Sequence, residues 1–252
     1  MMPGGGHDAP KTQVNGTAVS ANRCWATGTT PTQVSKPARR TPTTTEQPRR
    51  EPNAMDAQHW DEMYRGSDRV FSGSPNPVLI AEATDLPPGQ ALDVGCGEGA
   101  DALWLARRGW RVTAVDISVI ALQRAAAAAT DVGDRVTWAR TDLTTASLPA
   151  DAFDLVSIHY FPLRRRPGHT ALYRLLNAVA PGGTLLFSTH ARADLPAREG
   201  FDPADYYQPD DIARLLDPTW NVLINGTRPR AAPAPAGTHH THDTVLRAVR
   251  RP

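Results

Sequence analysis

The chain has 252 residues, with 27 Lys and Arg against 26 Asp and Glu, and a formal net charge of +1. This balance argues against a protein whose main task is to coat nucleic acid or an anionic membrane. No apolar run approaches the roughly 18 residues of a membrane-spanning helix. The two cysteines, Cys24 and Cys96, would make a poor framework as a single bridge, so we expect free thiols in a reducing compartment.

Residues 1 to 54 differ in composition from the rest of the chain. They are rich in Thr, Pro, Gly and Arg, and Trp25 is their only aromatic residue. Such a segment cannot bury enough apolar surface to offset the entropy of ordering, so we predict a disordered extension over 1–54 and a folded domain over 55–252. No continuous apolar segment typical of a signal peptide follows the early basic residues, which favours a cytoplasmic protein. Met55 is a candidate true start.

From Met55 onward, short apolar runs alternate with helical patterns. The first half predicts, in chain order, a helix over 56–65, a helix that Asn76 caps and Pro77 begins, a strand over 91–94, a helix over 100–108, a strand over 111–115, and a helix that Ser118 caps and that runs through alanines 125–129. The second half predicts strands over 135–139 and 153–158, a helix over 169–179 closed by Pro181-Gly182-Gly183, a strand over 184–189, a helix over 210–216, and strands over 220–225 and 244–249.

This alternation predicts an α/β fold with a doubly wound, mostly parallel sheet. No helix separates the last two strands, and the segment between them, 226–243, is rich in Pro and Ala. We therefore expect those two strands to pair as an antiparallel hairpin.

A glycine-rich segment, Asp93-Val94-Gly95-Cys96-Gly97-Glu98-Gly99, lies between the first predicted strand and the helix that follows it. Ligands of open α/β sheets bind beyond the carboxyl ends of the strands, and glycines there permit positive φ and close backbone approach. Asp116 ends the second strand, where an acid can accept both hydrogen bonds of a ribose diol. Asp142 follows the third strand, where an acid can accept from an adenine amine. Together these features predict a pocket for an adenosine-bearing ligand.

The same loop also satisfies a dinucleotide-binding fingerprint, as Gly95-x-Gly97-x-x-Ala100. Asp93 and Glu98 beside the loop would repel a pyrophosphate, whereas they would attract a cationic ligand. Asp142 has no evident role in a dinucleotide site, and a closing antiparallel hairpin does not fit an all-parallel dinucleotide fold. An NAD(P)-dependent oxidoreductase is therefore the alternative enzyme class.

The segment from Leu92 to Gly99, with Asp116 and Asp142-Leu143, resembles the motifs of class I S-adenosylmethionine-dependent methyltransferases. Trp60-Asp61-x-x-Tyr64 followed by Phe71-Ser72 more loosely resembles the thiopurine and tellurite-resistance type of small-molecule enzyme. The resemblance implies a Rossmann-like, seven-stranded sheet of order 3-2-1-4-5-7-6 with strand 7 antiparallel. It also implies S-adenosyl-L-methionine as methyl donor and a small-molecule acceptor, with no membrane or nucleic-acid partner; oligomeric state is left open.

The resemblance assigns a cofactor role to twelve residues: Trp60, Tyr64, Asp93, Gly95, Cys96, Gly97, Gly99, Asp116, Ile117, Asp142, Leu143 and His159. The glycine loop would cradle the methionine part and the ribose, and Asp93 would hold the methionine ammonium together with the His159 carbonyl. Asp116 would take the ribose hydroxyls, with Ile117 packed on the adenine. The adenine amine would reach Asp142, and the Leu143 N–H a ring nitrogen. A non-catalytic S-adenosylmethionine-binding module, which would keep this pocket, is a second alternative.

A catalytic base is not identified by the sequence. His159 and Tyr160 follow the fourth predicted strand and His190 ends the fifth, and Tyr206 and Tyr207 are further candidates. Each of them would serve equally as a pocket wall. Positioning and desolvation are expected to supply most of the catalysis, because a sulfonium is already an activated methyl donor.

Three other sequence features bear on metal binding, substrate charge and nucleic-acid substrates. The run His239-His240-Thr241-His242-Asp243 has metal-ligand residue types, but adjacent histidines rarely converge on one ion, and a polar hairpin turn without a metal is expected. Arg164-Arg165-Arg166 would either steer an acidic substrate or form a solvated loop. The tetrapeptide of enzymes that methylate base amino groups is absent after the fourth strand, which argues against a nucleic-acid substrate.

The predicted helix over 56–65 lies outside the seven-strand pattern and presents Trp60 and Tyr64 one turn apart. It would either pack on the sheet edge or form a flap over the cofactor. In the second case, loop 191–208 with Phe201, Tyr206 and Tyr207 would form the opposite wall of the acceptor site.

Overall fold

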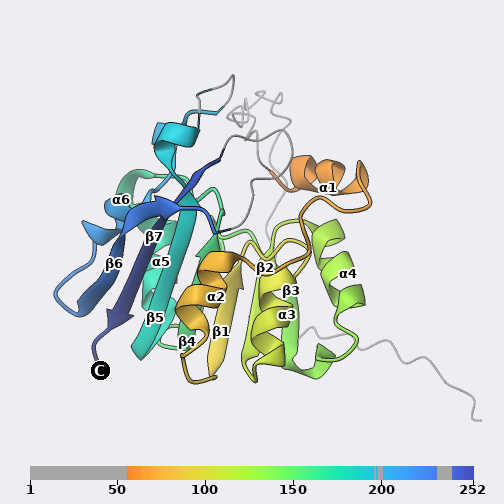
Figure 1. Cartoon of the computed structure of the whole chain (residues 1–252), viewed down its shortest axis with the longest axis horizontal. Coiled ribbons are helices and arrows are strands. Elements are labelled where there is room, and N and C mark those ends of the chain that lie inside the picture. The colour runs from red at the N-terminus through yellow and green to blue at the C-terminus, as the bar shows by residue number, and fades with distance from the viewer. Residues whose placement is uncertain (1–55, 196, 198–200, 232–239) are drawn as a thin grey trace, which may run out of the picture. The chain divides into compact units, whose positions relative to one another are not determined.

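Seven strands form one mixed sheet in the order β3-β2-β1-β4-β5-β7-β6 (Figure 1). The computed structural model describes residues 56–195, 197, 201–231 and 240–252. The strands are β1 (Gln90–Val94), β2 (Arg111–Asp116), β3 (Val136–Arg140), β4 (Phe153–His159), β5 (Val179–His190), β6 (Trp220–Pro229) and β7 (His242–Arg250). All neighbouring pairs are parallel except those that β7 makes with β5 and β6. The predicted order and the antiparallel last strand are confirmed.

Helices cover both faces of this sheet. They are α1 (Ala57–Arg65), α2 (Pro77–Ala83), α3 (Ala100–Arg107), α4 (Val119–Ala128), α5 (Thr170–Ala178) and α6 (Pro209–Ala213). In Figure 1, α2 and α3 lie in front of the sheet and α5 lies behind it. Each described helix is too short or too polar to cross a membrane.

Two apolar cores form because the parallel strands are buried on both faces. Along β1, Leu92 and Val94 pack into the core that contains α5 and α6, whereas Ala91 packs into the core beneath α2 and α3. This alternation follows from the two-residue period of a strand. It places Asp93 on the α2 and α3 face, where an acid takes the position of an apolar side chain.

Most predicted boundaries agree within a few residues, and the Ser118 cap of α4 is confirmed, because its Oγ accepts from the Ala121 N–H at 3.2 Å. Asn76 is the N-cap residue of α2 and Pro77 its first residue, as predicted, but the Asn76 side chain does not cap the helix. Asn76 makes no side-chain cap bond to α2 and instead donates its backbone N–H and its side-chain amide to Asp101, both at 2.7 Å. A sequence pattern cannot show this, since Asp101 lies 25 residues away.

The two largest differences between predicted and observed elements concern where strands begin and end. β5 begins at Val179, so Pro181-Gly182-Gly183 lies inside the strand instead of closing the helix before it. Val179 already pairs with Phe153. The pairing then shifts register between Phe153 and Leu155, and this irregularity accommodates Gly182, whose φ is positive. β6 and β7 continue to Pro229 and from His242, so their link is shorter than predicted. Cross-strand pairing, such as Gly226 with Val245, overrides the local turn signals.

Residues 1–54, predicted to be disordered, and Cys24 within them lie outside the described residues.

Candidate active site

The predicted cofactor residues gather where β1 and β2 end and their loops begin. The N–H groups of Gly95 and Cys96 both donate to the Val115 carbonyl, at 2.8 and 3.0 Å, which turns the loop after β1 over the end of β2. Parallel strands bring their carboxyl ends to one edge of the sheet, and β1 pairs with both β2 and β4. The loop therefore lies at the switch point expected of a ligand site.

The glycines of this loop are required by geometry. Gly95, Gly97 and Gly99 have φ of +68°, +52° and +84°, a region that side chains rarely adopt. A Cβ at Gly95 would lie 2.5 Å from the Phe161 ring, and one at Gly97 would lie 2.9 Å from the Tyr64 hydroxyl. The loop thus forms a cradle whose space any side chain would fill.

Asp116 connects this cradle to the second strand. Its Oδ2 accepts from the Gly97 N–H at 2.9 Å, and its Oδ1 accepts from the Ser118 N–H at 2.8 Å. Each carboxylate oxygen has a second lone pair, so two acceptor positions remain for a diol. Burial raises the pKa of Asp116, and its backbone hydrogen bonds oppose that rise.

Asp93 is buried, and its Oδ2 has no hydrogen-bond partner among the described residues. Burial, followed by the charges of Asp101 and Asp116, raises its pKa well above the usual range. Buried polar atoms are normally satisfied, so an unpaired carboxylate oxygen here fits a cationic group such as an ammonium. The same acids would repel a pyrophosphate.

A strap of chain between α1 and α2 is held against the glycine loop by two charged residues. Glu98 accepts from the backbone N–H groups of Val70 and Phe71, each at 3.2 Å, and pairs with Arg124 at 3.0 Å. Arg124 also donates to the carbonyls of Tyr64 and Ser67, at 2.6 and 2.7 Å. These contacts join the end of α1 to α4, beside which α1 lies in Figure 1.

The two aromatic residues of α1 serve different parts of the site. Tyr64 is 2% exposed and meets the Phe71 ring edge-on at 6.2 Å, close to Gly97. Burial, then the charges of Asp116 and Glu98, raises its pKa. Trp60 lines a cavity next to the loop. Asp61 fastens the helix between them by accepting from the Ser118 hydroxyl at 2.6 Å.

The remaining predicted cofactor residues are less closely gathered. Asp142 is exposed, and its Oδ1 accepts from the N–H and hydroxyl of Thr144 at 2.9 and 2.7 Å, so it shapes a turn after β3. The Leu143 side chain belongs to the apolar core. Ile117 is half-buried beside Asp116. Cys96 is a free thiol whose pKa is raised by burial and then by Asp93.

The catalytic candidates differ in access. His159 is buried, its Nδ1 lies 2.6 Å from the Ser188 hydroxyl, and its Nε2 has no partner among the described residues. Burial lowers its pKa. Tyr160, with a φ of +52°, donates its hydroxyl to Asp243 at 3.0 Å. A positive φ in a residue with a side chain is strained and concentrates at functional sites.

A cavity of about 180 Å³ opens over the ends of β4 and β5. It is lined by Trp60, Tyr160, Phe161, Pro162, Thr189, His190, Leu195, Phe201, Pro203, Tyr206, Tyr207 and Gln208. Phe161 also contacts the Gly95 position, so the cavity adjoins the glycine cradle. Loop residues Phe201, Tyr206 and Tyr207 form one wall and Trp60 of α1 contributes to the lining, as the flap hypothesis expects.

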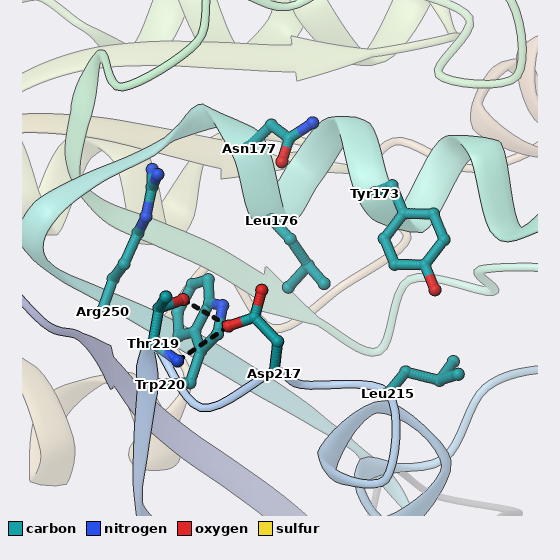
Figure 2. A pocket seen from close by; sticks show the side chains of 8 residues that line it. All are labelled: Tyr173, Leu176, Asn177, Leu215, Asp217, Thr219, Trp220 and Arg250. Atoms are coloured by element: carbon teal, nitrogen blue, oxygen red, sulfur yellow. Dashed lines mark hydrogen bonds between the residues drawn. The ribbon is translucent and has the colours of Figure 1, made fainter.

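A second cavity, of about 80 Å³, is shown in Figure 2. It lies between α5, the start of β6 and the end of β7. Asp217 there accepts from the N–H and hydroxyl of Thr219, so its carboxylate is used within its own turn. This cavity has no contact with the predicted site residues.

Two charged residues beside the catalytic candidates have no sequence signal that identifies them. Arg230 and Asp243 form a buried pair at 3.1 Å beside Tyr160 and His190. In the arginine run after β4, Arg164 and Arg165 form ion pairs with Asp205 and Asp211, at 2.9 and 3.6 Å. Within the described part of the chain, no three His, Cys, Asp or Glu side chains are arranged to hold a metal ion, and His239 lies outside that part.

Comparison with known proteins places this site in a family. A family model described as a methyltransferase domain matches residues 91–183. An uncharacterized methyltransferase of Mycobacterium tuberculosis is 43% identical over 108 residues, which are 41% of this chain and 52% of that protein. The chain thus spans about half the length of this relative.

A second relative, the 2-heptyl-1-hydroxyquinolin-4(1H)-one methyltransferase of Mycobacteroides abscessus, is 31% identical over 156 residues, or 60% of this chain and 67% of that protein. The solved structure of the N-methyltransferase NodS from Bradyrhizobium japonicum, with S-adenosyl-L-homocysteine, has the same fold, with a TM-score of 0.59 and 19% identity over 77% of this chain and 97% of that chain. The motifs, the strand order and the relatives of the present chain together show that it belongs to the class I S-adenosylmethionine-dependent methyltransferases.

Proposed function

We propose that this protein transfers a methyl group from S-adenosyl-L-methionine to a small-molecule acceptor. One observation carries the proposal: Asp116 holds the glycine loop through Gly97 while keeping free acceptor positions, next to an unpaired Asp93 and an aromatic cavity. When bound, the cofactor supplies a methyl group on a positively charged sulfur.

The residues have distinct roles in this proposal. Asp93 takes the ammonium, and a cation there would relieve the electrostatic strain of the buried acid pair that it forms with Asp101. Asp116 takes the ribose hydroxyls and at the same time fixes the backbone of the cradle. The adenine lies near Ile117, with Asp142 accepting from its amine. Tyr64 and the strap to Phe71 close the site against water, which strengthens electrostatic attraction to the sulfonium.

A small-molecule acceptor is favoured by the cavity and by one relative. The volume of about 180 Å³ suits a compact guest and not a polymer. The M. abscessus relative is named for a small heteroaromatic acceptor. A cytoplasmic location and the absence of nucleic-acid partners stay predictions from the sequence.

Calorimetry with S-adenosylhomocysteine and with NAD tests the cofactor assignment. We expect S-adenosylhomocysteine to bind and NAD to fail, because the acids around the loop repel a pyrophosphate. Binding of NAD without S-adenosylhomocysteine would establish the oxidoreductase alternative. Binding of S-adenosylhomocysteine without methylation of any acceptor in a broad screen would favour a non-catalytic module.

A further inference from the structure

The cavity next to the glycine loop is lined largely by aromatic side chains, which are Trp60, Tyr160, Phe161, Phe201, Tyr206 and Tyr207. Among the lining rings, Tyr160 stacks on His190 at 4.5 Å with 29° between their planes, and Phe201 stacks on Tyr206 at 5.2 Å and 25°. An apolar cavity of about 150 Å³ is large enough to hold benzene, so the roughly 180 Å³ here matches one substituted ring. The aromatic lining and this volume favour a planar aromatic guest.

The loop that carries the second ring pair is tied to the body of the protein. The N–H of Arg165 donates to the Asp205 carbonyl at 2.7 Å, and the Tyr207 N–H donates to the Leu163 carbonyl at 2.9 Å. The Tyr207 hydroxyl lies 2.5 Å from Nδ1 of His169. These hydrogen bonds fix the position of the loop that carries Phe201 and Tyr206, and a pocket that selects its guest by shape needs such fixed side chains.

His190 presents one edge of its ring to this cavity. Its two faces are covered, by Tyr160 at 4.5 Å and by His240 at 3.8 Å. Its Nδ1 lies 3.1 Å from a guanidinium nitrogen of Arg230. His190 lines the cavity, and because Arg230 occupies Nδ1, Nε2 is the ring nitrogen left for a guest.

Arg230 determines which nitrogen of His190 carries the proton. A guanidinium only donates, so Nδ1 must accept and Nε2 must carry the hydrogen in the neutral ring. Arg230 itself is held by Asp243 at 3.1 Å, with the two side chains 12% and 4% exposed. Protonation of Nδ1 would place two donors against each other, so this contact also disfavours the imidazolium.

The charges around His190 act in the same direction. Burial, then His240 and Arg230, lower its pKa to about 4, while Asp194 opposes them. Asp243 faces Arg230 and not the ring, and Tyr160 donates its hydroxyl to Asp243. His190 is thus a neutral hydrogen-bond donor at neutral pH and has no lone pair available on the cavity side.

The other titratable side chains that line the cavity are not suited to be bases either. Burial raises the pKa values of Tyr160, Tyr206 and Tyr207, and a neutral phenol does not take up a proton. His159, although in sequence next to Tyr160, is buried and is absent from the cavity lining. Among the described residues, the cavity therefore holds donors but no competent general base.

We propose that this cavity takes a planar aromatic acceptor whose oxygen is already ionised in solution, and that His190 positions this oxyanion with its Nε2–H. This rests on the proposed methyl transfer. The acceptor oxygen contributes the electron pair of the new O–C bond, and the electron pair of the broken C–S bond stays on sulfur. No proton is transferred, so the reaction needs no base.

Binding of 4-nitrophenol and 4-methylphenol to the full chain tests the proposal without turnover. Both have one ring, but near neutral pH only the former is substantially ionised. We expect the protein to bind 4-nitrophenol at least about tenfold more tightly, since hydrogen bonds to charged groups are the strong ones. The absorbance of the bound probe should show the phenolate. Equal affinities, bound neutral phenol, or no binding of either probe would overturn the proposal.

Two substitutions separate a donor from a base. His190→Gln keeps an amide N–H close to the Nε2 position, whereas His190→Ala removes it. We expect His190→Ala to weaken 4-nitrophenolate binding about 10- to 100-fold and His190→Gln to retain most of the affinity. For a series of phenols that are methylated, the pH at which kcat/KM rises should follow the acidity of the phenol. A rise at one pH for all phenols, with both variants equally inactive, would make His190 a base.

Failure of the acceptor assignment can be distinguished from failure of the proposed function. S-adenosylhomocysteine binding, measured in the same preparations, reports the cofactor site alone. Intact cofactor binding with failed phenolate binding would refute the acceptor assignment and leave the methyltransferase proposal standing.

Discussion

Asp93 occupies a position at which an apolar side chain would suit the fold better. It lies on the α2 and α3 face of the sheet, where its strand neighbour Ala91 packs into the core. Its Oδ2 has no partner among the residues that the structure describes, and Asp101 adds a second buried carboxyl close by. A buried charge without a partner destabilises a fold. We infer that this position is maintained for the ligand and not for stability.

Asp93→Asn should stabilise the ligand-free protein and weaken cofactor binding. The raised pKa means that the stability associated with the protonated Asp93 is present in acid and is lost as pH rises through its folded-state pKa. The melting temperature of the variant should therefore exceed that of the wild type near neutral pH, by about 2–4 °C per kcal/mol relieved. The two should converge in acid, where Asp93 is protonated in both states. A variant that melts lower at neutral pH would show that Asp93 is stabilised by a partner.

Asp116→Ala should remove two hydrogen bonds to the ribose and loosen Gly97 and Ser118 as well. We expect cofactor affinity to fall by on the order of 2–4 kcal/mol, since both lost bonds are charge-assisted. Asp131→Ala is the matched control, because Asp131 is exposed, precedes β3 and pairs with Arg107 of α3. Calorimetry with S-adenosylhomocysteine measures both; an unchanged affinity in Asp116→Ala would mean that the ribose is bound elsewhere.

Tyr64→Ala should weaken S-adenosylmethionine more than S-adenosylhomocysteine. Tyr64 lies against Gly97, and aromatic faces attract cations by roughly 0.5–2 kcal/mol. Only the methyl donor carries a positive sulfur, so the difference isolates this attraction from packing. Tyr64→Phe keeps a ring and should preserve the preference. If Tyr64→Ala weakens both ligands equally, Tyr64 contributes packing alone.

At the scale of secondary-structure elements, α1 is fastened to the site by polar contacts from α4 and from the glycine loop. Arg124 of α4 holds the carbonyls of Tyr64 and Ser67, and Glu98 holds the N–H groups of Val70 and Phe71. Tyr64 of α1 is buried, but Phe71 is 52% exposed, so apolar burial contributes little to holding the strap after α1. A segment held mainly by polar contacts can open locally at lower free energy than the core.

Arg124→Met should release this strap. The change keeps the aliphatic stem but removes the contacts to Glu98, Tyr64 and Ser67, so we expect faster hydrogen exchange over 57–71 and weaker S-adenosylhomocysteine binding. Arg107→Met is the matched control, because Arg107 of α3 makes a half-exposed ion pair with Asp131, and exposed pairs contribute little to stability. Equal exchange over 57–71 in both variants would show that α1 is held by other contacts.

At the scale of the whole molecule, the sheet brings residues from distant parts of the sequence to one edge. The β5–β7 and β6–β7 pairings place Asp243 beside His190 and Arg228 in register. The same pairings let Arg228 and Arg247 reach Glu82 on α2, at 2.8 and 3.4 Å. The C-terminal hairpin therefore supports both His190, which lines the proposed acceptor cavity, and α2.

A protein that begins at Met55 should keep the melting transition and the cofactor affinity of the full chain. Among the described residues, 56 onward already supply two apolar cores and the glycine cradle, and residues 1 to 54 lack the apolar composition needed to join a core. Differential scanning calorimetry of both forms provides the comparison. A lower melting temperature after truncation would show that the extension docks on the domain.

The residues of the sequence predicted the alternation of strands and helices, the antiparallel hairpin, the glycine cradle and the acid at the end of β2. These features depend on local periodicity and on short spacings, which remain the same wherever the segment lies in space. The strand order was implied by the resemblance of the motifs to a known family. The strand limits at Pro181 and Gly226 were predicted less well, because pairing with a distant strand overrode local turn signals.

Only the tertiary structure decided the chemistry of the acceptor cavity. Nothing in the sequence near His190 shows that Arg230, 40 residues later, donates to its Nδ1, or that Asp243 holds both Arg230 and Tyr160. Likewise, the sequence places Asn76 at the start of α2, but only the structure shows that its amide donates to Asp101 and not to the helix. Protonation state and hydrogen-bond direction depend on which groups lie next to one another in space. The pairing of distant strands decides these neighbours, and the order of residues along the chain does not show them.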